Sequence, residues 1–294
     1  MKSVRFKPTV LDLLLLIAMA GAFLFVIYRL TFSLNYKWNW SIIPTYLVRF
    51  DSESGRWTAN VLLEGLLTTI RLSIWGMLLA GILGLVMGLA RTAKRLFFKL
   101  CARTYVELIR NTPPLVLVFI FYFFVSDQIL PAIGVESFVR GLSESGIYWL
   151  TLVAAPPDLF VPFLSGVVTI GIFQGAYITE IVRAGIEAID IGQWEASRAL
   201  GLKRWQQIRL IILPQALRIM LPPLANEFIN TIKYSSIVSI ISIQELTFQG
   251  LQVMSSTQVT IEVWLTITCM YLLLCLTLSL LVQRLENRLS VQAA

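Results

Sequence analysis

Residues 192–217, GQWEASRALGLKRWQQIRLIILPQAL, place basic and amide side chains between two apolar stretches. The region carries the signals of a short helix. Asp190 can cap its start, Gln193 can return a bond to that cap, and Gly201 can end the helix in a left-handed turn. A bilayer span needs about 20 residues, and this helix has about ten. The sequence therefore predicts a short helix that lies along a membrane surface between two spans.

The composition of the chain is that of a membrane protein. Of its 294 residues, 57% are hydrophobic and 14% are charged, whereas a soluble domain usually carries about 25% charged residues. Six stretches are long enough to cross a bilayer, although the third and the fifth contain polar residues. They are residues 11–30, 72–90, 115–130, 162–182, 217–243 and 264–282. We therefore expect an all-α membrane protein with about six transmembrane helices.

Basic residues predict the orientation of the spans, because Lys and Arg in short loops stay on the cytoplasmic side. Residues 91–111 and 183–218 hold six Lys and Arg each. Residues 126–161 hold one, and residues 244–263 hold none. The first two connections are therefore expected in the cytoplasm and the last two outside. With six spans, both chain termini are expected in the cytoplasm.

Several functional classes are disfavoured by residues that the sequence lacks. It contains no His, and its three Cys form no CxxC pair, so a zinc or haem site and a Ser-His-Asp triad are not expected. It also lacks the GxxxxGK[ST] phosphate loop, so we expect no ATP site of that kind. The net charge of +7 is accounted for by the cytoplasmic loops, which argues against nucleic-acid binding. No enzyme activity and no cofactor are expected in this chain.

The fifth span carries a polar face. Asn226, Asn230 and Lys233 follow one another at helical spacings of four and three residues. Glu227 lies about 60° from Asn230 around the helix. Ionisable side chains in a membrane are costly, so they usually face a cavity or a partner. The proline pair at residues 222–223 predicts an interruption of the helix just before this face.

Two interpretations of the short surface helix stay open on physical grounds alone. Its apolar residues could rest on lipid headgroups or in the groove of a soluble partner. These residues are Trp194, Ala196, Ala199 and Leu200. A helix that only rests on lipid gains from bulky apolar groups. Small residues such as Ser197 therefore favour a protein groove.

The spacing from Glu195 to Pro214 resembles the EAA signature of ABC-transporter permease subunits. Glu195, Ala196 and Ser197 are followed after three residues by Gly201, and after nine more by Ile211, Leu213 and Pro214. From about residue 60 to the C-terminus, further blocks are similar to permeases of the polar amino acid uptake family. They read YVELIRNTPPLV, GAYITEIVRAGIEAI, LPQALRIMLPPLANEFI and IKYSSIVSIISIQEL.

This resemblance implies a five-helix importer core, formed by residues 60–294, with a cytoplasmic coupling helix between the fourth and fifth spans. Residues 1–59 would add an N-terminal transmembrane helix and an external loop. The coupling helix would seat in a groove of an ATPase through Glu195, Ala196, Arg198 and Gly201. The sequence departs from the family at Ser197, which replaces a second Ala, and at Tyr234, where many members have Asp or Asn.

The implied function is that of a permease subunit of an ATP-driven importer for polar amino acids in the bacterial inner membrane. The expected partners are two ATPase subunits that bind ATP and magnesium, a second permease subunit, identical or paralogous, an external solute-binding protein, the amino acid and membrane lipid. The alternative is an autonomous ion-coupled carrier or channel whose short helix rests on lipid.

The polar face of the fifth span is expected to line the translocation path. An amino-acid zwitterion needs one group of each charge sign, and this face offers both. Residues of the fourth span would face the path nearer the cytoplasm. The expected path residues are Asn226, Glu227, Asn230 and Lys233, with Gln174, Thr179 and Glu180. Pairing inside the assembled protein explains Glu227 and Lys233 equally well.

Overall fold

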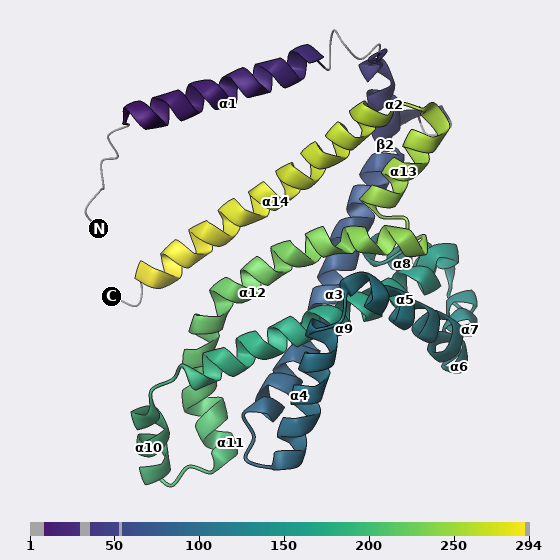
Figure 1. Ribbon diagram of the computed structural model, residues 1–294. Helices are drawn as coiled ribbons and strands as arrows, with labels where there is room; N and C mark the ends of the chain where they lie inside the picture. The colour runs from purple at the N-terminus through teal and green to yellow at the C-terminus, as the bar shows by residue number, and fades with distance from the viewer. Residues whose placement is uncertain (1–8, 30–35, 53–54, 292–294) are drawn as a thin grey trace. The chain divides into compact units, whose positions relative to one another are not determined.

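The computed structural model describes residues 9–29, 36–52 and 55–291 (Figure 1). Contacts along the chain form two compact units, Met1–Ser41 and Ile42–Ala294. The first unit contains α1 (Val10–Tyr28), which is apolar apart from Asp12 in its first turn.

The second unit begins before the predicted domain boundary between residues 59 and 60. Ile43 is buried in one hydrophobic cluster with Leu62 and Leu246. The segment that follows Ser41 therefore packs with the helices of the second unit. The extent of the permease domain itself stays a prediction.

Five helical stretches among the described residues are long and apolar enough to cross a membrane, as five of the six predicted spans require. They are Val61–Arg91, Pro114–Ala132, Pro157–Glu187, Arg204–Ile241 and Thr260–Arg284. The remaining predicted span, residues 11–30, corresponds to α1. Its apolar part, Val10–Phe25, is shorter than the other five, and residue 30 lies outside the described residues.

The most extensive packing joins α3 (Val61–Arg91) to α9 (Pro157–Glu187). Small residues on α3 make this possible. A Cβ added at Gly76 would lie 2.8 Å from Cγ2 of Ile170, and one at Gly84 would collide with the side chain of Ile178. Branched side chains of α9 therefore lie directly on the backbone of α3, as in other close helix pairs in membranes.

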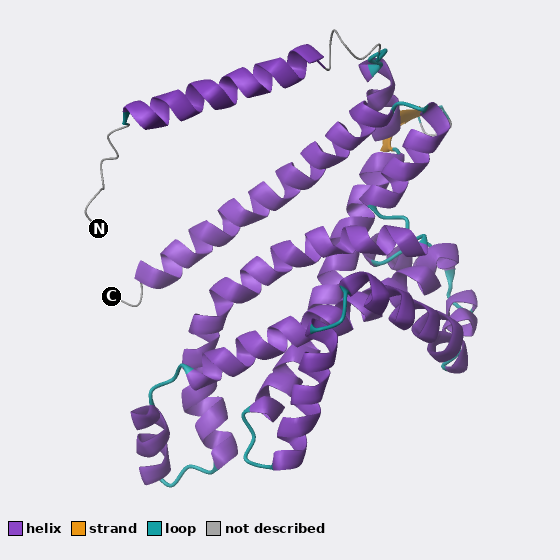
Figure 2. Ribbon diagram, viewed as in Figure 1, coloured by secondary structure: helices purple, strands orange, loops and turns teal. Residues whose placement is uncertain are grey.

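The remaining elements follow in chain order, and helices dominate the described residues (Figure 2). The hairpin of β1 and β2 pairs antiparallel, with Val48 opposite Ala59. The elements before α9 are η2 (Trp40–Ile42), α2 (Ile43–Leu47), β1 (Val48–Asp51), β2 (Arg56–Ala59), α4 (Leu96–Arg110), α5 (Pro114–Phe124), η3 (Val125–Ile129), α6 (Leu130–Ala132), α7 (Val135–Arg140) and α8 (Glu144–Val153). Those after α9 are α10 (Ile191–Ala199), α11 (Arg204–Gln206), η4 (Gln207–Ile212), α12 (Leu213–Ser235), η5 (Ser236–Ile241), α13 (Leu246–Thr257) and α14 (Thr260–Val291).

The predicted interruption at the proline pair is wrong, because α12 continues through Pro222 and Pro223. The helical geometry changes instead at the two ends of α12. The π-helical turn η4 ends just before Pro214, and its wider backbone gives room to the proline ring, which would otherwise clash with the carbonyl group four residues earlier. At the other end the chain tightens into the 3-10 helix η5.

Candidate functional site

The short helix predicted from the sequence is α10, and both of its ends are capped. Asp190 Oδ1 accepts a hydrogen bond of 2.6 Å from the backbone N–H of Gly192. Gly201 has a φ of 74°, which is the left-handed conformation that glycine adopts at helix ends. The N–H of Leu202 donates to the carbonyl of Ser197 at 3.2 Å, across the closing turn. These local bonds set the two ends of α10.

The predicted return bond from Gln193 to the cap is wrong. The side-chain oxygen of Gln193 accepts a hydrogen bond of 3.3 Å from Nε2 of Gln215 instead. Gln215 also donates to the carbonyl of Ile211 at 2.8 Å. The first turn of α12 lies beside α10 and supplies the competing amide donor, so Gln193 joins the two helices.

Trp194 was predicted to belong to the outer apolar surface of α10, but it faces the protein. Its half-buried ring packs on a hydrophobic cluster that includes Ile186 of α9 and Ile212. The guanidinium of Arg204 lies over the indole, 3.9 Å from the ring centroid, in the geometry of a cation–π contact. Ser197 is 2% exposed and donates to the carbonyl of Trp194 at 2.9 Å. The inner face of α10 is therefore held against α9 and the base of α12.

The outer face of α10 carries the residues expected to couple to an ATPase. Glu195, Ala196, Arg198 and Gly201 are all exposed. Two large apolar side chains flank them, Ile191 and Leu200, which are 72% and 77% exposed. In the part of the chain that the structure describes, neither Glu195 nor Arg198 forms an ion pair. The face thus combines apolar and charged groups that have no partner among the described residues.

Gln174 of α9 is fully buried and joins α9 to α12. Its Nε2 donates to the hydroxyl of Thr231 at 2.8 Å, and Thr231 in turn donates to the carbonyl of Glu227 at 2.8 Å. The side-chain oxygen of Gln174 is buried without a hydrogen-bond partner in the structure. Gln174 therefore lies directly behind the polar face of α12.

The other two expected path residues of α9 bond within α9 and to α3, and their place in the path stays a prediction. Thr179 is fully buried, and its hydroxyl donates to the carbonyl of Gly175 at 2.7 Å within α9. Glu180 accepts hydrogen bonds of 2.8 Å from Arg91 of α3 and of 2.8 Å from Arg183. Arg183 also pairs with Glu187. Glu180 is therefore neutralised by two guanidinium groups.

The four polar residues of α12 lie on one helix, as predicted, and differ in exposure. Glu227 and Asn230 are half-buried and in contact, with Asn230 Nδ2 donating to Glu227 Oε2 at 3.4 Å. Asn226 and Lys233 are exposed. Within the described residues, the side chains of these two form no hydrogen bond. Among the described residues, the side chains of Asn226 and Lys233 on the polar face are thus left without a hydrogen-bond partner.

Aromatic residues beside this face were not predicted. The ring of Phe173 lies 5.3 Å from that of Tyr177 and 5.5 Å from that of Tyr234. The guanidinium of Arg110 on α4 lies 5.4 Å from the centroid of Tyr177. Tyr177 follows Gln174 by three residues, so helical periodicity could have placed it on the face that meets α12. Nothing in the sequence pattern indicated that Arg110 would reach it.

Comparisons with known proteins show which family the chain belongs to. The family described as "Binding-protein-dependent transport system inner membrane component" matches residues 76–291. The chain is 37% identical over 240 residues to the glutamine transport system permease protein GlnP of Escherichia coli (strain K12), covering 81% of this chain and 97% of that protein. It is 32% identical to the probable glutamine ABC transporter permease protein GlnM of Bacillus subtilis (strain 168), covering 78% of this chain and 94% of that protein.

Two solved structures share the fold. A crystal structure of an amino acid ABC transporter with histidines has a TM-score of 0.61 at 32% identity, covering 78% of this chain and 94% of that chain. An inward-facing structure of the MetNI methionine ABC transporter has a TM-score of 0.57 at 17% identity, covering 78% of this chain and 96% of that chain. At this lower identity only the fold is comparable.

Proposed function

The chain belongs to the family of binding-protein-dependent transport system inner membrane components, and we propose that it imports a polar amino acid with α10 as its contact to a separate ATPase. Its relatives are amino-acid ABC permeases. The chain is accordingly a transport subunit and not an enzyme. ATP and magnesium bind to the ATPase in this proposal.

The observation that carries the proposal is the division of α10 into two faces. The inner face is fixed by Trp194, Arg204 and the bond between Gln193 and Gln215. The outer face presents Ile191 and Leu200 beside the charged Glu195 and Arg198. A helix that is braced in this way can transmit a push from a docked protein to α9 and α12, because rigid packed elements move together.

The remaining partners follow from the kind of transporter. Importers that use a binding protein need an external solute-binding protein to deliver the amino acid. We propose two ATPase subunits and a second permease subunit, because one chain with one coupling helix cannot enclose a path. Exposed leucines along α14, such as Leu272 and Leu276, fit contact with lipid or with that second subunit. Both termini lie in the cytoplasm in this proposal, on the side of α10.

The proposed substrate path consists of Asn226, Glu227, Asn230 and Lys233 on α12, with Gln174 behind them. Glu227 and Lys233 supply the two charge signs that a zwitterion requires. The burial of Thr179 and the pairing of Glu180 with Arg91 argue for supporting roles of these two residues outside the path.

The docking role of α10 predicts a sharp loss of ATPase binding when its outer face receives a charge. Leu200→Asp should lower the amount of co-expressed ATPase that co-purifies with the permease by at least about tenfold, since a buried interface anchor contributes 2 kcal/mol or more. Leu152→Asp is the matched control. Leu152 is 48% exposed on α8, far along the chain from α10, so it should leave co-purification unchanged.

Reconstituted vesicles separate this proposal from an autonomous carrier or channel. Vesicles that contain the permease, its ATPase and loaded solute-binding protein should take up radiolabelled L-glutamine only when ATP is present on the ATPase side. Uptake by the permease alone, driven by an ion gradient, would contradict the proposal and favour the carrier.

A further inference from the structure

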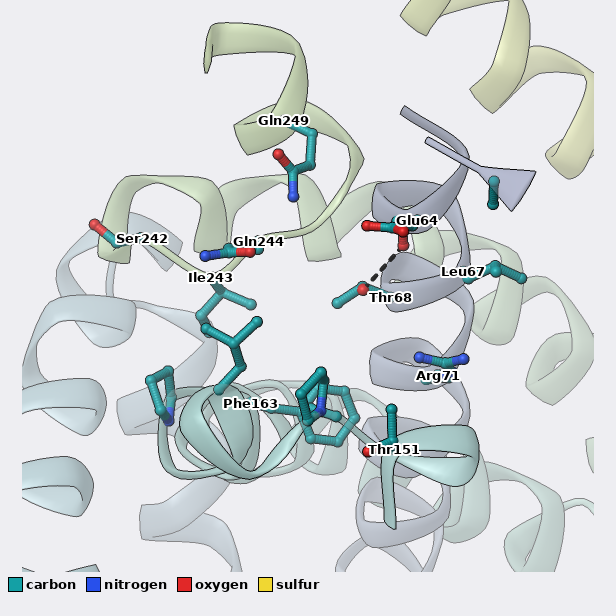
Figure 3. A pocket seen from close by; sticks show the side chains of 15 residues that line it. Glu64, Leu67, Thr68, Arg71, Thr151, Phe163, Ser242, Ile243, Gln244 and Gln249 are labelled. Carbon is teal, nitrogen blue, oxygen red and sulfur yellow. Dashed lines mark hydrogen bonds between the residues drawn. The ribbon is translucent and has the colours of Figure 1, made fainter. Parts of the chain in front are cut away.

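A cavity of about 350 Å³ lies between the first half of α3 and the segment that joins η5 to α13 (Figure 3). Its polar lining comes from both sides. These residues are Glu64, Thr68 and Arg71 on α3, and Ser242, Gln244 and Gln249 on the opposite wall. Phe163 and Ile243 contribute apolar surface. The volume lies within the range of about 300–1,000 Å³ that is typical of small-molecule pockets.

The cavity and α10 lie at different ends of the same helices. The last turns of α3 reach the hydrophobic cluster against which Trp194 of α10 packs, through Leu89. The cavity instead involves the opposite half of α3, around Glu64 and Arg71. Along the chain, the wall with Ser242 and Gln244 follows the Lys233 end of α12 after one short segment, η5. An amino acid in this cavity would lie beyond that end of the polar face.

Arg71 is the first group in the cavity that needs a ligand. It lies inside the membrane-spanning helix α3, and its side chain is half-buried. Among the described residues it forms no ion pair, unlike Arg91 at the other end of the same helix. Arg71 directly precedes the predicted span 72–90, and a charged side chain of a membrane-spanning helix marks a functional position when it faces a cavity. The guanidinium fork of arginine fits a carboxylate with two parallel hydrogen bonds.

Gln249 is the second such group. It is 6% exposed, and its side-chain oxygen is buried without a hydrogen-bond partner. Its side chain is held against α3, because a Cβ added at Gly65 would lie 2.9 Å from Cγ of Gln249. A buried acceptor without a donor is unfavourable unless a ligand supplies the donor. The side-chain oxygen of Gln249 needs an N–H donor. The carboxylate of Glu64 at the cavity rim adds negative charge, which favours a cationic donor.

The wall that carries Gln249 is fixed by a buried network around Glu245. Glu245 Oε1 accepts from the N–H of Phe248 at 2.8 Å, and Oε2 accepts from the hydroxyl of Tyr271 on α14 at 2.7 Å. The N–H of Leu246 donates to the hydroxyl of Thr69 on α3 at 3.1 Å. These bonds join α3, α13 and α14. The two walls are therefore held at a set separation, which lowers the cost of ordering a ligand between them.

We infer that this cavity is an entry site that binds the α-carboxylate of the transported amino acid at Arg71 and its α-ammonium group at Gln249 and Glu64. The inference rests on the proposed function, since it gives the same substrate a second binding site, which it occupies before it reaches the polar face of α12. The methylene groups of the substrate side chain pack on Phe163 and Ile243. The amides and hydroxyls of the lining form hydrogen bonds with a polar group at the end of that side chain. A zwitterion matches the cavity because the lining holds a cation, Arg71, together with two acceptors, Glu64 on the same wall and Gln249 on the opposite wall.

Thiol protection locates the ligand directly. Thr68→Cys is placed in a full-length permease whose Cys101, Cys269 and Cys275 are replaced by Ala, assembled with its ATPase in vesicles of phosphatidylglycerol. Within the described ranges, the hydroxyl of Thr68 bonds only to the carbonyl of Glu64 in α3, so a Cys is tolerated there. Saturating L-glutamine should slow labelling by a membrane-impermeant thiol reagent at least about threefold. Methylamine, which lacks the carboxylate, should give no protection.

Variants of Arg71 test the same site without an engineered cysteine. Arg71→Gln should reduce L-glutamine uptake by the complete importer about tenfold or more, since a hydrogen-bonded charge pair is lost. Arg71→Lys, which keeps the charge, should retain more uptake than Arg71→Gln. Arg140→Gln is the control, because Arg140 is a largely exposed arginine on α7 that does not line this cavity. ATPase co-purification and the melting temperature should be unchanged in all three.

The outcomes separate the entry site from the proposed function. Normal ATP-driven uptake together with no glutamine protection, or with unaffected Arg71→Gln, overturns the entry site and leaves the importer in place. Protection by phosphatidylethanolamine vesicles without glutamine also overturns it and assigns the cavity to a lipid headgroup. Absence of any ATP-dependent uptake in the wild-type complex overturns the proposed function, and the entry site with it.

Discussion

Two carboxylates in neighbouring spans, Glu180 on α9 and Glu227 on α12, have opposite surroundings. Glu180 accepts two charged hydrogen bonds of 2.8 Å, from Arg91 and Arg183. Glu227 has one neutral donor, the amide of Asn230 at 3.4 Å. Both residues were expected to line one path, and the sequence treats them alike, as single acidic residues in apolar helices.

The contrast separates charges that hold the fold from charges that are available to a ligand. A carboxylate between two guanidinium groups is neutralised in place and connects α9 to α3. A carboxylate without a cation keeps its capacity to bind a cationic group, such as the ammonium of an amino acid. We therefore propose a structural role for Glu180 and a substrate role for Glu227. Measurements on these two residues, and on a third carboxylate, can test this distinction.

Removal of the charge of Glu180 should affect stability most. Glu180→Gln leaves Arg91 without its counter-charge and leaves Arg183 paired with Glu187 alone. The side chains of Arg91 and Arg183 are 15% and 30% exposed. Loss of one partner of a buried ion pair should lower the free energy of unfolding by about 3 kcal/mol. Chemical denaturation in detergent measures this loss.

Glu187→Gln is the matched control for that change. Glu187 pairs with Arg183 as well, but its side chain is 54% exposed, and exposed pairs contribute about 0–1 kcal/mol. Equal destabilisation by the two variants would contradict the structural role assigned to Glu180.

Glu245 is a third case, a buried carboxylate that forms no ion pair in the part of the chain that the structure describes. Burial raises the pKa of Glu245 from 4.5 to about 7, because the charged form is poorly solvated there. The folded state therefore binds the proton more tightly than the unfolded state. The stabilisation is complete below the unfolded pKa and is lost as the pH rises through the folded pKa. Stability should fall by about 2.5 kcal/mol between about pH 5 and about pH 8.

Denaturation of wild type and Glu245→Gln across this pH range checks the prediction. The glutamine is neutral at every pH, so the part of the slope due to Glu245 should disappear in the variant. A variant that keeps the full wild-type slope would show that Glu245 is not the group that titrates.

Glu227→Gln should change transport without changing stability. Because Glu227 forms no ion pair with any described residue, the free energy of unfolding should change by less than about 0.5 kcal/mol. Uptake of L-glutamine by the complete importer should fall roughly tenfold, as expected for the loss of one charged contact to the substrate. ATP hydrolysis by the assembled complex should stay largely intact. Unchanged uptake would remove Glu227 from the path.

The spans and α10 could be predicted because their signals are local. A run of apolar residues predicts a span by its own length, and the cap at Asp190 and the left-handed turn at Gly201 each act over a few residues. The helical spacing of Asn226, Asn230 and Lys233 was equally readable. These features depend on neighbours along the chain, so no tertiary contact was needed to find them.

The roles of individual side chains depended on contacts between segments that are far apart in the sequence. Arg91 of α3 forms an ion pair with Glu180 of α9. Gln215 of α12 forms a hydrogen bond with Gln193, which was predicted to bond to the cap of α10. Arg71 and Gln249 face one cavity from distant parts of the chain. Helical periodicity states which residues share a face, but the partner that covers this face sets burial and pairing. Packing of α3, α9, α12 and α13 therefore decided which polar residues hold the protein together and which remain free for a ligand.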